Sequence, residues 1–149
     1  MNIADLKNIS VLSREGKSVE TAEWKVTCKI STEDTEGKFS AVIFNFKKGF
    51  QFAMNKHTKY DKFCYLINGK IDICENGKSV IAEPGYINYL PKNTPHKLDC
   101  LEESEILMVY MPGGLEKMIF ELGDLTNSGN LDENSVKELL ARFGSEICE

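Results

Sequence analysis

The chain of 149 residues carries 18 basic and 23 acidic side chains, so its net charge at pH 7 is −5. An acidic chain without a basic stripe is not expected to bind nucleic acid or an anionic membrane surface. No stretch reaches the roughly 18 consecutive apolar residues of a membrane-spanning helix, and the first ten residues lack the apolar centre of a signal peptide. The sequence therefore favours a soluble, cytoplasmic protein of about one domain.

The cysteines argue against both a disulfide framework and a zinc knuckle. They are odd in number, widely separated along the chain and never arranged as a CxxC pair. We expect all of them to be reduced thiols. The five are Cys28, Cys64, Cys74, Cys100 and Cys148.

Short β-rich segments separated by turn residues fill the region between residues 23 and 111. This spacing is typical of an antiparallel sandwich or barrel and excludes alternating strand–helix units. The expected strands are 23–30, 38–46, 50–57, 62–67, 70–74, 79–82, 86–90, 96–100 and 105–111.

Two Asn-Gly pairs lie between β-rich segments, and this dipeptide is the strongest short-range signal for a tight hairpin. Asn68-Gly69 separates residues 62–67 from 70–74, and it is predicted to form a two-residue hairpin turn with positive φ at both positions. Asn76-Gly77 is expected to turn the chain into the next strand.

Beyond Pro112 the apolar residues follow a helical period. The first predicted helix ends at Gly123, and the second runs from an Asp132 N-cap to a stop at Gly144. Both helices should pack on the barrel through their apolar faces. We expect one domain over residues 1–149, with a barrel at about 20–111 and a helical tail at about 113–144. The apolar helix positions are Leu115, Met118, Ile119, Leu122, Val136, Leu139, Leu140 and Phe143.

Residues 49–100 resemble the two motifs of the cupin superfamily, G(x)5HxH(x)3-4E(x)6G and G(x)5PxG(x)2H(x)3N. Every spacing is kept, whereas four residue types differ: Asn55 replaces the first His, Lys62 the Glu, Asn93 the Gly and Cys100 the Asn. The motif positions are Gly49, Asn55, His57, Lys62 and Gly69, followed by Gly85, Pro91, Asn93, His96 and Cys100.

The segment Pro112-Gly113-Gly114-Leu115-Glu116-Lys117 is also similar to the tail of the quercetin-dioxygenase-like cupins, in which a Pro-Gly-Gly turn leads into a closing helix. The resemblance implies an all-β fold, an antiparallel double-sheet jelly-roll barrel of the RmlC-like type, followed by two short C-terminal helices. It also implies a homodimer, because cupins commonly form one.

Strand alternation turns the motif positions toward one point. Residues two apart on a strand face the same side, so Asn55 and His57 should meet Lys62 and His96 inside the barrel. The same alternation places Gln51 in this pocket. It also predicts that Ala53, Cys64, Leu66, Leu98 and Cys100 face inward, and that Phe50, Phe52 and Met54 cover the opposite face.

In an intact cupin these four positions hold a metal with three His and one Glu. The resemblance therefore implies a site for Zn, Fe, Mn or Ni in which His57, His96 and Asn55 would be the ligands. Two histidines and an amide oxygen are a weak set, however, and a positive charge at Lys62 opposes a dication. We expect the barrel to be metal-free or to bind metal weakly.

Lys62 has three interpretations. Its long stem could carry the ammonium out to water at the barrel mouth. The ammonium could instead bind a substrate carboxylate or phosphate. In the third interpretation desolvation lowers the pKa of the amine, which then acts as a nucleophile or base.

Three functions follow from this set of residues. The favoured one is a cupin that holds a small polar or anionic ligand through Gln51, Asn55, His57, Lys62 and His96. The alternatives are a metal-dependent enzyme of the dioxygenase, isomerase or decarboxylase type and a structural or sensory barrel without chemistry. The ligand and the presence of catalysis stay open at this stage.

Overall fold

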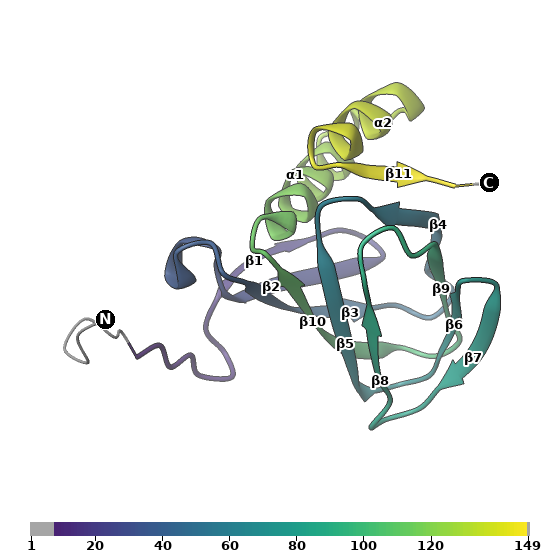
Figure 1. The fold of residues 1–149 in the computed structure, drawn as a ribbon, viewed down its shortest axis with the longest axis horizontal. Coiled ribbons are helices and arrows are strands. Elements are labelled where there is room, and N and C mark those ends of the chain that lie inside the picture. Colours follow the sequence, from purple (N-terminus) through teal and green to yellow (C-terminus); the bar gives the residue numbers. More distant parts are fainter. Residues whose placement is uncertain (1–7, 149) are drawn as a thin grey trace.

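The computed structural model describes residues 8–148, which form two antiparallel sheets facing each other and two helices at one end (Figure 1). The six-stranded sheet contains, in order, β1 (Lys17–Glu20), β2 (Trp24–Ile30), β3 (Ser40–Phe46), β10 (Ser104–Met111), β5 (Asp61–Asn68) and β8 (Ile87–Leu90). The five-stranded sheet contains β11 (Ser145–Ile147), β4 (Gln51–His57), β9 (His96–Cys100), β6 (Ile71–Glu75) and β7 (Lys78–Ala82). The predicted all-β double-sheet fold is confirmed.

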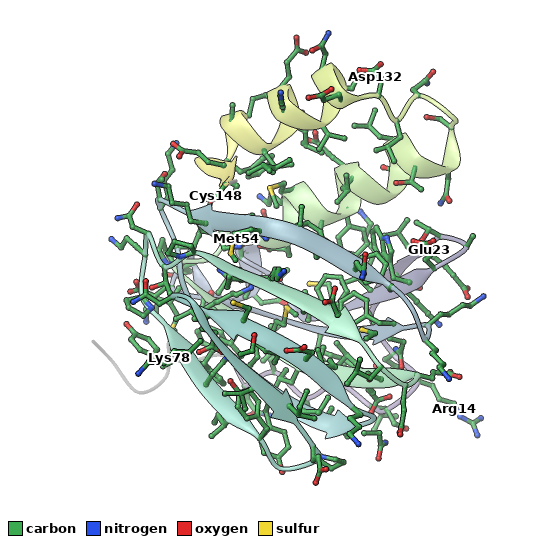
Figure 2. All side chains as sticks on the ribbon, turned by 90° about the vertical axis from the view of Figure 1, so that its right-hand side faces the viewer. Arg14, Glu23, Met54, Lys78, Asp132 and Cys148 are labelled. Carbon is green, nitrogen blue, oxygen red and sulfur yellow. The ribbon has the colours of Figure 1, made fainter. Side chains whose placement is uncertain are left out.

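Alternate residues of the strands point between the sheets and form the core (Figure 2). Val42, Phe44 and Phe46 lie on the inner side of β3, where each is at most 5% exposed. The ring of Phe46 stacks on those of Phe44 and Phe50, with ring centroids 4.9 Å apart in both pairs. One part of the barrel interior is therefore filled by packed aromatic rings.

The predicted hairpin at Asn68-Gly69 is wrong. Strands β5 and β6 belong to different sheets, so this Asn-Gly pair joins the two layers and does not close a hairpin. Only Gly69 has a positive φ, at 100°. An added Cβ there would lie 2.5 Å from the carbonyl oxygen of Glu103, which explains why glycine is needed.

The second Asn-Gly pair does form a tight hairpin. Glu75 pairs with Lys78 across the β6–β7 ladder, and the two residues between them are Asn76 and Gly77. Their φ angles are 51° and 84°, as a type I′ turn requires.

Two helices follow the barrel, α1 (Leu115–Asn127) and α2 (Glu133–Arg142). Gly123 lies inside α1 and does not end it, contrary to the sequence prediction. An added Cβ at Gly123 would approach Val19 to 2.8 Å, so this glycine permits close packing of the helix on the sheet. The predicted N-cap of α2 is confirmed, because Asp132 accepts a hydrogen bond from the backbone N–H of Ser135 at 2.8 Å. Neither helix of residues 8–148 is long and apolar enough to span a membrane.

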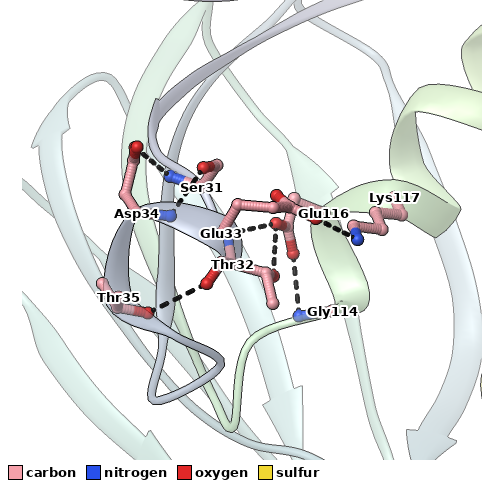
Figure 3. Close-up of polar contacts among 8 residues, drawn as sticks. All are labelled: Ser31, Thr32, Glu33, Asp34, Thr35, Gly114, Glu116 and Lys117. Atoms are coloured by element: carbon pink, nitrogen blue, oxygen red, sulfur yellow. Dashed lines mark hydrogen bonds and ion pairs between the residues drawn. The ribbon is translucent and has the colours of Figure 1, made fainter.

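A buried carboxylate fixes the start of α1 (Figure 3). Glu116 is 4% exposed. It accepts hydrogen bonds from the backbone N–H and hydroxyl of Thr32, at 2.8 and 2.5 Å, and from the N–H of Gly114 at 2.9 Å. Thr32 precedes the short 3-10 helix η2 (Glu33–Thr35). The Pro-Gly-Gly tail is thereby tied to a distant loop, and α1 is held over the barrel.

Candidate functional site

A cavity of about 50 Å³ lies inside the barrel, and four of the predicted site residues line it. Asn55, His57, Lys62 and His96 are each between 3 and 8% exposed. Because one water needs roughly 10–15 Å³ of such space, the cavity has room for about three to five waters or a ligand of a few non-hydrogen atoms.

The remaining wall of the cavity is almost entirely apolar. Aromatic side chains from β2, β3, β4 and β10 surround it, and α1 covers it with four aliphatic residues. These walls consist of Trp24, Phe44, Phe46, Phe50, Phe52, Leu98, Met108, Tyr110, Leu115, Met118, Ile119 and Leu122, with exposed Lys97 at the rim. The cavity therefore has one polar end and one long apolar side.

A β-bulge in β4 changes which residues reach the cavity. Phe52 pairs with Leu98 of β9, yet the next pair joins Asn55 to His96, so three residues of β4 span what two residues of β9 span. An extra residue in one strand reverses the alternation of sides beyond it. The residues before and after the bulge therefore do not follow one continuous pattern.

The bulge makes the prediction for Gln51 wrong. Gln51 and Ala53 are exposed and lie outside the cavity, whereas Phe50 and Phe52 point into it. The motif spacing placed Asn55 correctly, because Asn55 lies beyond the bulge. The alternation of inward and outward residues could not be extended from Asn55 back to Gln51, because the bulge lies between them. Gln51 therefore takes no part in this site.

His57 is held by a residue that the sequence analysis did not consider. Its Nδ1 lies 2.7 Å from the hydroxyl of Ser145, on the short strand β11 that pairs with β4. Burial, followed by the nearby charges of Lys62 and His96, lowers the pKa of His57 to about 2. His57 is thus neutral at pH 7.

His96 has a defined tautomer. Its Nδ1 lies 2.8 Å from the carbonyl oxygen of Thr94, and because a carbonyl only accepts, this nitrogen carries the proton. The pKa of His96 is lowered to about 3 by burial first and by Lys62 second. In the neutral ring of His96, Nε2 is therefore a hydrogen-bond acceptor. The centroids of the His57 and His96 rings lie 5.2 Å apart.

Lys62 is buried without a partner in the protein. Within residues 8–148, its Nζ makes no hydrogen bond or ion pair, and the side chain is 7% exposed. The stem of Lys62 is therefore enclosed, whereas its Nζ still borders accessible space, since among residues 8–148 the fully buried side-chain N or O atom without a hydrogen bond is Oγ of Ser40. Burial lowers the pKa of Lys62, while Cys64 and Glu75 act in the opposite direction.

The donors do not match the metal set of an intact cupin. Asn55 uses its amide nitrogen to bond the carbonyl oxygen of Ala53 at 2.8 Å, which leaves one neutral oxygen beside two imidazoles. Lys62 occupies the place of the carboxylate. In the described part of the chain, no three His, Cys, Asp or Glu residues are grouped to hold a metal ion.

Glu75 is a further polar residue near the site that the motif did not indicate. It accepts hydrogen bonds from the hydroxyl of Tyr86, at 2.8 Å, and from the amide of Asn88. Burial first, and Glu75 second, raise the pKa of Tyr86 to about 12. Strand alternation could have indicated Glu75, since it lies two residues beyond Ile73 and four beyond Ile71 on one strand. Residues two apart on a strand face the same side.

Comparisons with known proteins agree with this fold. Quercetin 2,3-dioxygenase of Bacillus subtilis (strain 168) is 25% identical over 114 residues, which are 75% of this chain and 34% of that protein. The chain thus spans about a third of the length of this curated relative.

Solved structures with similar folds include KdgF from Halomonas sp., with a TM-score of 0.65 and 18% identity over 72% of this chain and 97% of that one. An RmlC-like cupin from Shewanella frigidimarina NCIMB 400 has a TM-score of 0.64 at 14% identity, covering 75% and 96%. Ectoine synthase from P. lautus has a TM-score of 0.64 at 19% identity, covering 78% and 84%. At these identities the likeness establishes the cupin fold alone.

A family model described as "Ethanolamine utilisation protein EutQ" matches residues 2–116, which is most of the chain and includes every strand of the barrel that lines the cavity. The chain therefore belongs to the EutQ family of the cupin superfamily.

Proposed function

We propose that the protein binds a small polar or anionic molecule in the barrel cavity without a resident metal. The observation that carries this proposal is Lys62, a buried amine at the cavity that has no partner among residues 8–148. Among residues 8–148 Nζ is not a fully enclosed atom, so the space beside it can hold a ligand with a hydrogen-bond acceptor. Such a ligand would give the amine the partner that the protein does not provide.

The polar end and the apolar wall suggest how such a ligand would lie. Its oxygen atoms would meet Lys62, while Nε2 of His96 would accept a hydrogen bond from a hydroxyl or acid group. Any hydrocarbon part would contact the phenyl rings and α1. Burial lowers the pKa of Lys62, and a bound anion beside the amine would act in the opposite direction by favouring its charged form.

A metal-dependent enzyme is the second candidate. In its favour, the Nδ1 atoms of both His57 and His96 are engaged, an arrangement that would orient Nε2 toward a shared ligand. The curated relative is named as a dioxygenase. Against it stand the missing carboxylate and the lysine at its position, so we place metal-free binding first.

Ligand binding can be tested by thermal shift and calorimetry with short-chain carboxylates, inorganic phosphate and small diols. We expect at least one of them to stabilise the wild type, and the effect to disappear in Lys62→Met. Lys97→Met is the matched control, because Lys97 is exposed at the rim of the same cavity, and it should keep the effect.

Metal content separates the two candidates. Protein purified without chelator should contain no stoichiometric Zn, Fe, Mn or Ni by elemental mass spectrometry. The double change Asn55→His with Lys62→Glu rebuilds three His and one carboxylate, and metal binding should tighten by orders of magnitude. A stoichiometric metal in wild type, with an affinity that Lys62→Glu changes by less than about tenfold, or 1.4 kcal/mol, would favour the metal enzyme.

A further inference from the structure

The amine of Lys62 has the surroundings of a reactive group as well as a binding group. Strand β5 lies between β10 and β8, where Lys62 pairs with Tyr110 on one side and Leu90 on the other. The backbone is thus fixed inside a sheet. The side chain reaches the cavity, and no acceptor within residues 8–148 holds the amine in place.

We propose that Lys62 forms a Schiff base with a small aldehyde bound in the barrel cavity. The inference rests on the proposed function, since it assigns a substrate class to the same cavity. A neutral aldehyde meets both ends of the site, with its carbonyl at Lys62 and its alkyl group against the apolar wall. The volume of about 50 Å³ limits it to a few carbon atoms.

The reaction needs one proton transfer within the bound adduct. The lone pair of Nζ attacks the carbonyl carbon, a C–N bond forms, and the π electrons move to oxygen. Transfer of one proton from nitrogen to oxygen produces a carbinolamine. The nitrogen lone pair then forms C=N while the C–O bond breaks and water leaves, so amine and aldehyde become imine and water without a redox change.

With a pKa of about 3, His96 is too weak a base to take up the proton, so its neutral ring orients the transfer by accepting a hydrogen bond. The proton passes from nitrogen to the departing hydroxyl directly or through a water molecule. Nε2 of His96 is the free acceptor at the cavity. Burial favours the uncharged, nucleophilic form of the Lys62 amine. Glu75 lies close enough to favour positive charge at Lys62 and would support a protonated imine.

Reductive trapping tests the proposal directly. Wild type, Lys62→Met and Lys97→Met are incubated with propanal and cyanoborohydride, and the products are analysed by intact mass and peptide mapping. Circular dichroism checks that each variant is folded. We expect one propyl group on Lys62 to appear at least about tenfold faster than on Lys97, because the cavity holds the bound aldehyde beside the Lys62 amine. Lys62→Met should abolish this fast addition, and Lys97→Met should retain it.

A purely structural Lys62 makes the opposite prediction, since a buried amine without a reactive role would be among the slowest lysines to be modified. Labelling of Lys62 at or below the rate of exposed lysines overturns the proposal. If small ligands still stabilise the wild type through Lys62 in the thermal-shift experiment, the Schiff base fails and the proposed binding function stands. If neither effect occurs, both proposals fail.

Discussion

The inner and outer faces of β5 and β8 reverse the usual distribution of side chains. On the inner face, Lys62 is 7% exposed, although lysine is almost never buried unless it is paired. On the outer face, Ile87 and Tyr89 are 62% and 59% exposed. A charge-bearing residue is enclosed while large apolar residues meet solvent, so both faces depart from what folding alone would select.

The contrast is consistent with the proposed function, in which the two faces have different partners. A buried amine makes sense where a small ligand pairs with it. Apolar rows make sense where another protein surface covers them. Cross-strand pairing aligns two apolar rows, Ile87–Tyr65–Leu107–Ile43 and Tyr89–Phe63–Val109–Ala41. Ile87, Tyr89 and Tyr65 are exposed, whereas Val109 and Ala41 are already buried within the chain. Four experiments separate the two faces.

Acid should weaken the fold through the inner face. The folded-state pKa values of His57 and His96 are about 2 and about 3, whereas an unfolded histidine titrates near 6.5. Between these values the unfolded chain binds more protons, so stability falls as pH falls below 6.5. Lys62, whose pKa is also lowered, acts with the same sign at higher pH.

From pH 7 to pH 5 each histidine should cost about 2 kcal/mol, about 4 kcal/mol together. Urea unfolding at both pH values measures the change. In His96→Gln the loss of stability between pH 7 and pH 5 should be about half of the wild-type loss. Equal stability of the wild type at the two pH values would contradict buried, neutral histidines at positions 57 and 96.

Gly69→Val should destabilise the fold and so affect both faces of β5, because Gly69 directly follows this strand. The new side chain would meet the backbone of Glu103 and Ser104 and would also need a φ of 100°. We expect a loss of about 3 kcal/mol from combined strain and overpacking. Gly77→Val is the control, since no described atom lies within 4 Å of an added Cβ there and only the backbone strain remains, about 1 kcal/mol. Equal melting temperatures for the two variants would argue against the sheet-to-sheet connection at Gly69.

The two Asn-Gly pairs also show how far the sequence could predict this fold. Local turn chemistry was sufficient to end β5 and begin β6 near the right residues. It could not reveal that the strands belong to different sheets, because this depends on long-range pairing of β5 with β10 and β8. The prediction of a turn at Asn76-Gly77 was correct, because the two strands that this turn joins, β6 and β7, also pair with each other.

The candidate site followed the same division. Motif spacing placed Asn55, His57, Lys62 and His96, which the structure brings together at one cavity. Gln51 was misplaced because a β-bulge has no signal in the alternation itself. The contact of Ser145 with His57 depends on a strand of three residues, β11, which is too short to produce a pattern.

Lys62→Met should stabilise the unliganded protein and abolish the proposed ligand binding. Methionine keeps an unbranched apolar stem and leaves no buried amine to satisfy, so we expect a gain of about 2 kcal/mol in the free energy of unfolding. Chemical denaturation at pH 7 gives the value, and exposed Lys97→Met should change it by less than about 0.5 kcal/mol. A loss of stability in Lys62→Met would mean that the fold itself depends on this amine and would remove the main argument for a ligand.

A substitution on the outer face should weaken dimerisation and hardly change the free energy of unfolding. We expect a homodimer at micromolar concentration, since the exposed apolar residues of β8 and β5 adjoin half-buried Leu107 of β10 and Ile43 of β3 and would be covered by the same face of a second copy. Tyr89→Lys places a charge in this patch and, by symmetry, introduces it twice into the interface. Light scattering should show a dimer for the wild type and a monomer for the variant, whereas the monomer's unfolding free energy should change by no more than about 0.5 kcal/mol because the side chain is exposed within one chain. Ile147→Lys, at an exposed position on the other sheet, is the matched control and should remain dimeric. If the wild type stays monomeric over this range and binds no apolar dye, the outer face is not a dimer interface. The buried lysine would then be the remaining difference between the two faces of β5.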